Sequence, residues 1–409
     1  MRFLLIYPKW EKLDRQTRFI LPPHGPVVMA AALPPGVEVT FIDENVEPVD
    51  FEHGADLVGI SMMLTAQITR GWEIADAFRA RGIKVIFGGI ATMLHADECR
   101  LHADSIFLGE VEGRLEQVFA DFKTGKLQKV YDYMHNFPPI EGVGTARRSI
   151  LNRDLYNYRG VQMVDLVHAS RGCRFNCYPC AVRFLGGRSF RPRPYDKVVE
   201  EMASIDNNRL FIVDNSLAQD KEWEMGLFKE MIPLKKKWCC HPIEEDDQVL
   251  DLAAQAGAWF VYQTIFDSSD YIRNRIKRYH DFGIAVEGSI LLGLDYHTED
   301  YIKRWMDFLL EIELDMAEFT ILTPFPHTKT YDDLHSAGRI FSRDWRDYTC
   351  GKVVFQPKLM TPEKLQEMYY YCWDRFYEEE PANYKMFKML KIVMDKEKAD
   401  GTYKPRVRA

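Results

Sequence analysis

Three cysteines lie within one eight-residue stretch of this chain, C-R-F-N-C-Y-P-C, at Cys173, Cys177 and Cys180. Thiolates this close in sequence can bind three irons of a four-iron–four-sulfur (4Fe–4S) cluster. They leave the fourth iron without a protein ligand, so that it can bind another molecule. This spacing constrains the chain more than any other feature of its sequence.

Two other roles for the three thiols stay open. A structural zinc site normally needs four ligands, and the nearest further candidate, His168, lies five residues before Cys173. A disulfide with a spare thiol would suit a secreted protein, but the first residues, M-R-F-L-L-I-Y-P, lack the apolar length and cleavage site of a signal peptide. The remaining five cysteines show no paired pattern and are interpreted as buried or incidental thiols. Of these, Cys239 and Cys240 are neighbours and should point to opposite faces of a strand.

The composition is that of a protein free in the cytoplasm. The chain has 409 residues, enough for two or three domains, with 46% hydrophobic and 28% charged residues. Its apolar runs are too short to span a membrane, and a net charge of −8 argues against a nucleic-acid surface. A cluster with an open iron is oxygen-labile, which favours an anaerobic or microaerobic cytoplasm.

Residues 1–150 alternate between strand-like and helix-like segments, which predicts a doubly wound, Rossmann-like parallel sheet. Strands are expected at 2–7, 37–42, 56–61, 84–87 and 104–108, and helices at 26–33, 68–81 and 114–122. Ligands of such sheets bind beyond the carboxyl ends of the strands. That edge carries Pro8, Asp43, Ser61, Gly88, Gly89, Gly109 and Glu110.

Residues 151–345 contain six strand-like runs separated by helical ones, which predicts a partial (β/α)6 barrel. The strands are expected at 163–168, 209–213, 237–241, 259–264, 284–292 and 316–323. The cysteine stretch follows the first of them. Chemistry in such barrels gathers at the carboxyl ends of the strands.

Residues 346–409 are expected to form a small, mostly helical capping segment. Residues 353–357 are strand-like, and Thr361 and Pro362 begin an aromatic-rich helix that ends near Phe376. Such an aromatic stripe either lines an apolar cavity or packs on the barrel wall. The charged residues after about Glu397 are expected to be frayed.

The C-x3-C-x2-C spacing resembles the signature of the radical S-adenosylmethionine (radical SAM) superfamily, although Pro179 stands where relatives usually have an aromatic residue. In that family the open iron binds the amino and carboxylate groups of S-adenosylmethionine (SAM), and one electron cleaves it to methionine and a 5′-deoxyadenosyl radical. The fourth strand departs from the family, because Y-Q-T-I-F-D replaces the usual G-I-E-S. The resemblance implies SAM contacts at Tyr178, Asp214, Asn215, Gln263, Glu287, Ser289 and Thr323. Each of these candidate SAM contacts has an equally good alternative role as a turn residue or a helix cap.

The first 150 residues look like the cobalamin-binding domain found in many radical SAM proteins. Domains that ligate cobalt through histidine carry D-x-H-x-x-G, but this chain reads K-W-E-K-L-D-R at 9–15, and His24 is distant. Any cobalamin is therefore expected to lack a histidine ligand. A flavodoxin-like domain whose glycines only form turns is the alternative. The matching residues, and hence the implied contacts, are Ser61, Thr65, Gly88, Gly89, Gly109 and Glu110.

From Pro324 onward the chain resembles cobalamin-type radical SAM proteins that act on lipids, isoprenoids and tetrapyrroles. This implies SAM cleavage and cobalamin-dependent methylation of an unactivated carbon, with flavodoxin or ferredoxin as electron donor. Radical oxidation, cyclisation or rearrangement without cobalamin is one alternative, and a non-catalytic iron–sulfur or corrinoid binding protein is another. Four arginines after the cysteines either meet an anionic group or form ordinary surface pairs: Arg183, Arg188, Arg191 and Arg193.

Overall fold

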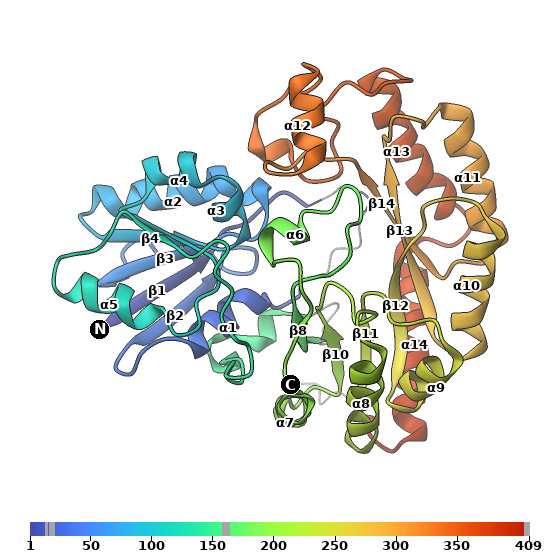
Figure 1. Cartoon of the computed structure of the whole chain (residues 1–409), viewed down its shortest axis with the longest axis horizontal. Helices are drawn as coiled ribbons and strands as arrows, with labels where there is room; N and C mark the ends of the chain where they lie inside the picture. Colours follow the sequence, from blue (N-terminus) through green and yellow to red (C-terminus); the bar gives the residue numbers. More distant parts are fainter. Residues whose placement is uncertain (13–14, 16–20, 158–163, 405–409) are drawn as a thin grey trace.

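The computed structural model describes residues 1–12, 15, 21–157 and 164–404. Two six-stranded parallel sheets form its framework, and the cysteine stretch lies between them (Figure 1). The predicted fold class, a doubly wound sheet followed by a partial barrel and a helical C-terminal segment, is confirmed. In the described part of the chain, every helix is too short or too polar to cross a bilayer.

The N-terminal sheet has the strand order β2-β1-β3-β4-β5-β6. One face packs against α2, α3 and α4, and the other packs against α1 and α5. Because both faces are covered, the strands are apolar almost throughout. The five predicted strands are present, whereas β6 was not predicted because three residues are too few to show a pattern. The strands are β1 (Arg2–Tyr7), β2 (Glu38–Asp43), β3 (Leu57–Ser61), β4 (Lys84–Gly88), β5 (Ser105–Leu108) and β6 (Val130–Asp132), and the helices are α1 (His24–Ala31), α2 (Ile68–Ala80), α3 (Ile90–Leu94), α4 (Ala96–His102) and α5 (Leu115–Lys123).

The second sheet runs β14-β13-β12-β11-β10-β7, so each strand lies beside its neighbour in chain order and the sheet forms a partial barrel. Five crossover helices cover its convex face. All six predicted strands are present, although residue 163, where the first was expected to begin, lies outside the described residues. The strands are β7 (Asp165–Val167), β10 (Arg209–Ile212), β11 (Lys237–Cys240), β12 (Ala258–Thr264), β13 (Ala285–Leu292) and β14 (Met316–Ile321), and the helices are α7 (Tyr195–Ser204), α8 (Lys221–Met231), α9 (Asp247–Gln255), α10 (Asp270–Asp281) and α11 (Glu299–Glu311).

Alternation along each barrel strand separates a convex core from a concave surface. Cys240 belongs to the convex core, and Cys239 belongs to a separate cluster on the concave side, as their adjacency predicted. The concave cluster is completed by Met386, Met389 and Leu390 of α14 (Ala382–Ala399). The last helix therefore lies across the inside of the half-barrel.

The C-terminal segment corrects two expectations. Residues 353–357 form no strand; Phe355 makes only an isolated antiparallel bridge to Ile340. The residues directly after Glu397 are not frayed, because α14 continues to Ala399 and Asp400 pairs with Lys237. Glu397 itself is buried and accepts two hydrogen bonds from Arg209, of 3.0 and 2.8 Å. The aromatic helix, α13 (Pro362–Phe376), is confirmed with Thr361 as its cap. Its preceding neighbour α12 (Lys329–Ser336) was not predicted.

A buried ion-pair group joins the first barrel helix to the rest of the molecule. Glu201 of α7 is 1% exposed, and its two carboxylate oxygens lie 2.7 Å from Arg148 and 2.8 Å from Arg193. Arg193 also donates to the backbone oxygen of His168, at 2.8 Å. Arg148 and Arg193 are therefore not part of a solvated basic loop. Because the Glu201 carboxylate is buried between them, its removal is expected to destabilise the fold.

We predict that Glu201→Ala lowers the free energy of unfolding by about 3 kcal/mol, because it leaves two buried guanidinium groups without their shared partner. The adjacent Glu200→Ala is a matched control, since Glu200 pairs with Lys197 at the surface. That change should cost less than about 1 kcal/mol. Urea denaturation of both variants measures the difference, and equal losses would contradict a structural role for the buried group.

Candidate active site

The cysteine stretch forms a loop after the short strand β8 (Ser170–Arg171). Gly172 begins it with φ +75°, and a Cβ there would lie 2.2 Å from the backbone oxygen of Ser189, so only glycine fits. Gln219, which is 1% exposed, accepts from the backbone N–H of Arg174 and donates to the backbone oxygen of Gly172. Buried polar contacts thus fix the start of the loop.

The three cysteines lie close together on an accessible loop. All three are free thiols and at least partly exposed, which leaves them accessible to a ligand. Burial raises the pKa of Cys180, and the negative charges of Cys177 and Cys173 raise it further, so the three sulfurs are electrostatic neighbours. Within the described residues, no three His, Cys, Asp or Glu side chains converge on one ion. The ligands of a 4Fe–4S cluster need not converge on one ion, because each binds a separate iron.

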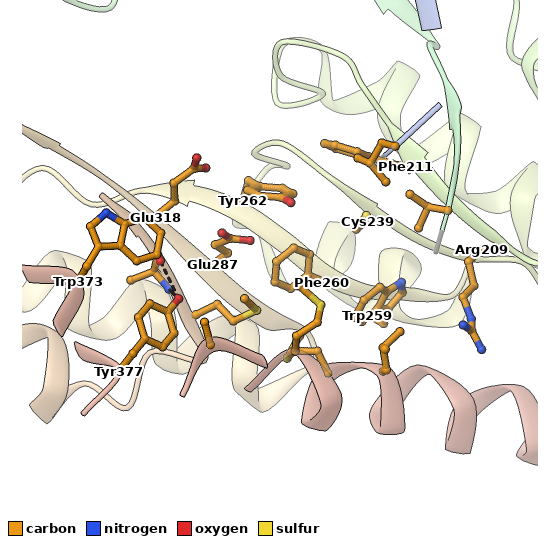
Figure 2. Close-up of a pocket in the computed structure, with 18 residues that line it drawn as sticks. Arg209, Phe211, Cys239, Trp259, Phe260, Tyr262, Glu287, Glu318, Trp373 and Tyr377 are labelled. Carbon is orange, nitrogen blue, oxygen red and sulfur yellow. Dashed lines mark hydrogen bonds between the residues drawn. The ribbon is translucent and has the colours of Figure 1, made fainter. Parts of the chain in front are cut away.

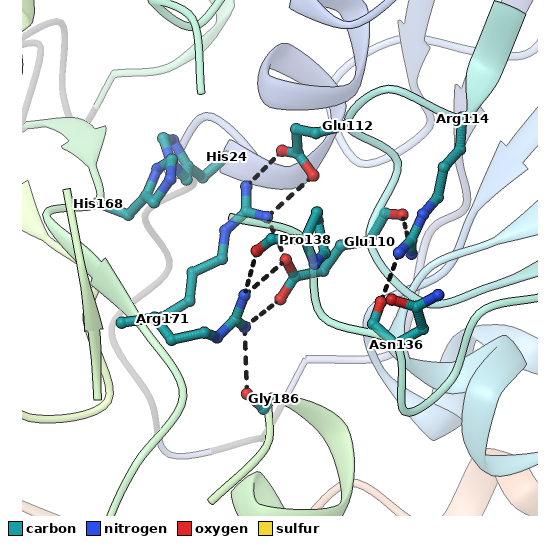
Figure 3. Close-up of polar contacts among 10 residues, drawn as sticks. His24, Glu110, Glu112, Arg114, Asn136, Pro138, His168, Arg171 and Gly186 are labelled. Atoms are coloured by element: carbon teal, nitrogen blue, oxygen red, sulfur yellow. Dashed lines mark hydrogen bonds and ion pairs between the residues drawn. The ribbon is translucent and has the colours of Figure 1, made fainter. Parts of the chain in front are cut away.

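A network of two arginines and two glutamates ties this loop to the N-terminal sheet (Figure 3). Arg171 donates to Glu110 at 2.9 Å and to Glu112 at 2.6 and 3.0 Å. Arg191, on the far side of the loop, donates to Glu110 as well and to the backbone oxygen of Gly186. Burial alone would raise the pKa of Glu112, but the hydrogen bond and charge of Arg171 lower it below its ordinary value. We call these four residues the interdomain clamp.

A cavity of about 400 Å³ lies between the carboxyl ends of the two sheets. The N-terminal sheet contributes five of the six residues proposed to meet cobalamin: Ser61, Gly88, Gly89, Gly109 and Glu110. The barrel side contributes two of the residues proposed to meet SAM, Asp214 and Asn215. The sixth cobalamin candidate, Thr65, does not line the cavity; it is buried beside His95, with 3.3 Å between its hydroxyl and the ring Nε2.

The glycines of this cavity leave room where other residues would close it. Gly89 and Gly109 have φ of +93° and +105°, and a Cβ on either would lie within 2.6 Å of a backbone oxygen. They are therefore required by the turns themselves. At Gly88, by contrast, a Cβ would meet nothing closer than 4.0 Å, so its missing side chain enlarges the cavity. This geometry fits the approach of a bulky cofactor tail.

Two histidines form the wall beside the clamp. His24 Nε2 lies 2.8 Å from His168 Nδ1, and burial lowers the pKa of both rings. The fold thus brings His24 into the cavity wall although it is far from the cysteines in sequence. Its ring faces another histidine, and the expectation of cobalt without a histidine ligand stays a prediction.

The other five candidate SAM contacts do not line this cavity. Tyr178 is 59% exposed beside Cys177 and Cys180, in a separate cleft that also contains Arg183 and Arg188. Gln263 is buried and donates to Glu245 at 3.1 Å. Thr323 is also buried and donates to the backbone oxygen of Ile321.

The last two candidates, Glu287 and Ser289, lie two residues apart on β13, on the face opposite the convex-core residues Val286 and Ile290. Glu287 lines a second cavity, on the concave side of the barrel. Only Asp214 and Asn215 are therefore brought together at the interdomain cavity, and all seven contacts remain predictions.

Sequence reasoning missed Arg171, Glu112 and Gln219. The only signal for Arg171 was its place directly before Gly172 and Cys173. Glu112 and Gln219 lay in turns that carried no pattern, and their roles depend on contacts with residues 59 and 47 positions away in sequence.

Asp214 positions the strand that leads into the cysteine loop. Its carboxylate accepts from the backbone N–H of Ala169, at 2.7 Å, and from the hydroxyl of Ser170. Burial raises the pKa of Asp214 to about 6, although these hydrogen bonds and Arg193 act in the opposite direction. The group therefore ionises close to neutral pH.

We predict that the stability of the chain relative to Asp214→Asn falls as pH rises from about 4 to about 7. Between an unfolded pKa of 3.8 and a folded pKa of about 6, the folded state holds a proton that the unfolded state has lost. The change amounts to up to about 3 kcal/mol. Urea denaturation at both pH values measures it. A pH-independent difference for Asp214→Asn would contradict the prediction.

Comparison with known proteins supports this picture. Residues 13–119 match the B12 binding domain model. The chain is 26% identical to bacteriochlorophyllide d C-12(1)-methyltransferase of Chlorobaculum tepidum, covering 90% of this chain and 85% of that protein. It is 22% identical to hopanoid C-2 methylase of Rhodopseudomonas palustris, covering 93% and 77%.

A solved structure shares the fold over most of the chain. The radical SAM methyltransferase TsrM from Kitasatospora setae, determined with cobalamin and a [4Fe-4S] cluster bound, superposes with a TM-score of 0.65 at 16% identity. The match covers 90% of this chain and 85% of that one. Together with the cysteine loop and the two sheets, these likenesses show that the chain resembles radical SAM methyltransferases and shares with them an N-terminal domain similar to the B12 binding domain.

Proposed function

We propose that this enzyme transfers a methyl group to an unactivated carbon of an apolar or partly apolar small molecule, using a 4Fe–4S cluster, SAM and cobalamin. One observation carries the proposal: a single cavity has Ser61 and Gly88 on one wall and Asp214 and Asn215 on the other. The candidate contacts of the two organic cofactors thus face one enclosure, next to the cysteine loop. That arrangement suits a reaction in which both cofactors act on one substrate.

When bound, the cluster and SAM supply a 5′-deoxyadenosyl radical, and cobalamin supplies a methyl group. The chain contributes binding and orientation. Cys173, Cys177 and Cys180 hold the cluster, and the clamp residues Arg171 and Glu110 hold the loop against the N-terminal sheet. Apolar walls from both sheets exclude water and oxygen.

The relatives support a methylated apolar substrate, since two of them are named for methylation of a bacteriochlorophyllide and a hopanoid. A reaction without cobalamin, such as oxidation or cyclisation, is the second candidate. The open space beside Gly88 favours the cobalamin-dependent reaction, because a glycine that only formed a turn, as in a flavodoxin-like domain, would not need that space.

We also propose that a flavodoxin or ferredoxin of the cytoplasm supplies the electron. Cys177 and Cys180 line an exposed cleft together with Arg183 and Arg188, and such a cleft would attract an acidic donor.

Cys177→Ala should abolish release of 5′-deoxyadenosine from SAM in the anaerobically reconstituted, reduced enzyme, because one cluster ligand is lost. Cys99→Ala, which removes a buried thiol of the N-terminal core, should keep both the iron and the activity. Iron and acid-labile sulfide are assayed with the product. Undiminished release from Cys177→Ala would refute the assignment of the cluster loop.

Gly88→Leu should keep the fold but lower cobalamin binding at least tenfold, because the side chain enters the cavity without striking the backbone. Gly142→Leu is the matched control, since Gly142 is exposed and has no atom within 4 Å of its Cβ position. Binding is followed by the visible spectrum of the corrinoid after gel filtration. Equal retention by both variants would favour a reaction without cobalamin.

A further inference from the structure

The open spaces inside this molecule differ in the charge of their walls. The second cavity, on the concave side of the barrel, is lined by the side chains of Glu287 and Glu318 (Figure 2). The cleft beside Cys177 and Cys180 is different, because its described lining residues include no aspartate or glutamate. This cleft has a volume of about 780 Å³, within the range of roughly 300–1,000 Å³ that is usual for small-molecule sites.

Two arginines of the cleft wall have no partner in the described part of the chain. Arg183 lies in the short helix α6 (Val182–Leu185), and Arg188 lies in the loop that follows it. Neither guanidinium makes a hydrogen bond or an ion pair with a described residue, and the Nε of Arg183 is buried. The other two arginines after the cysteines, Arg191 and Arg193, are both paired with carboxylates. The cleft therefore holds two positive charges that its described wall does not offset.

The cysteines do not remove this surplus of positive charge. Their thiolates are negative, but a bound cluster brings the positive charge of its irons, which offsets most of theirs. Lys329, another cation of the wall, already pairs with Asp333. The two guanidinium groups are therefore available to an anion that enters the cleft.

A buried hydroxyl in the same wall adds an independent sign of a ligand. Thr330, in the first turn of α12, is 1% exposed, and its Oγ1 has no hydrogen-bond partner among the described residues. Buried polar side-chain atoms are nearly always hydrogen-bonded, so this one points to a polar group that binds beside it. The N-terminal end of a helix favours an anion there. An acidic donor protein at the rim would leave this hydroxyl unpaired, whereas a small anion inside the cleft can accept from it.

The rest of the wall suits a flat apolar body. The rings of Phe184 and His327 are stacked, with 4.6 Å between their centroids and 7° between their planes, and Phe137 also lines the cleft. Val182 and Leu185 of the same helix, α6, line the interdomain cavity instead. One helix thus borders both spaces, and a molecule in the cleft lies beside the thiols and next to the cavity assigned to the organic cofactors.

We propose that Arg183 and Arg188 bind a carboxylate of the substrate, so that the substrate is a flat, largely apolar carboxylic acid. The planar fork of a guanidinium group can donate to both oxygens of a carboxylate. The hydroxyl of Thr330 donates to the same group, and the apolar body contacts Phe184 and Phe137. This inference rests on the proposed function and narrows its substrate class. SAM also has a carboxylate, but the family resemblance implies that the open iron binds it.

The test uses the anaerobically reconstituted full chain and two probes of nearly equal shape at pH 7, 2-naphthylacetate and 2-naphthylacetamide. Equilibrium dialysis gives the affinities. The acid should bind at least tenfold more tightly than the amide, because only the acid carries a charge. Arg183→Gln and Arg188→Gln should each weaken binding of the acid at least fivefold and leave the amide unchanged. Arg174→Gln is the matched control and should change neither, because Arg174 is exposed on the same loop but does not line the cleft.

Equal affinity for the two probes, or no measurable binding of the acid, would overturn the inference. So would binding of the acid that survives both glutamine substitutions, even if those substitutions slow reduction by flavodoxin, because the arginines would then serve the electron donor. Dialysis with SAM alone is the second arm. If both substitutions weaken SAM as much as the acid, the carboxylate that the arginines bind is that of the cofactor, and the inference fails.

Release of 5′-deoxyadenosine, assayed on the same wild-type preparation, separates this inference from the proposed function. Its absence refutes the radical reaction but leaves the probe affinities as the test of the cleft. If one variant does not fold by circular dichroism, the other variant and the comparison of acid with amide decide the outcome.

Discussion

The interdomain clamp is the interaction on which the rest of the site depends. Arg171 and Arg191 flank the cysteine loop in sequence, and both donate to Glu110 at the carboxyl end of the N-terminal sheet. The clamp side chains are only 14–17% exposed, so their hydrogen bonds act in a poorly solvated place where removal of one partner is costly. Two positive and two negative charges balance there. Because the loop is held from both of its ends, the thiols and the cavity between the sheets keep one relative position, which neither sheet could impose alone.

The clamp also changes the interpretation of Glu110. Its place after a strand of the N-terminal sheet made it a candidate cofactor contact, and it does line the cavity. Its carboxylate, however, is already engaged by two arginines, so its main role in the structure is to join the two halves. A residue at the carboxyl-terminal edge of a sheet, where ligands bind, can therefore act indirectly, by holding in place the cavity wall that faces the ligand.

Much of the fold could be predicted because its signals are local. Most of the eleven strands that were expected in the two sheets are apolar runs bounded by glycine, aspartate or proline, and the three cysteines lie within eight consecutive residues. The missed features depend on contacts between distant residues. The residues after Glu397 looked like a charged, frayed end, yet Lys237 pairs with Asp400 across 163 positions. Glu287 was a candidate contact on its own, and only the register of β13 and β14 sets it on one wall with Glu318. Gln263 and Tyr262 are neighbours in sequence, but side chains alternate along a strand. Gln263 therefore lies on the opposite face of β12 and does not line the cavity on the concave side of the barrel.

The position of α14 has a consequence for the order in which the molecule assembles. Every strand of the half-barrel precedes this helix in the sequence, so during synthesis the concave face emerges before the helix that covers it. Until the helix docks, Trp259, Phe260 and Met316 are exposed to water. Arg209 and Lys237 then also lack their later ion-pair partners, Glu397 and Asp400. A nascent chain in that state exposes an aggregation-prone apolar surface of the kind that chaperones bind. The cavity on the concave side of the barrel is thus complete only after the last helix has docked.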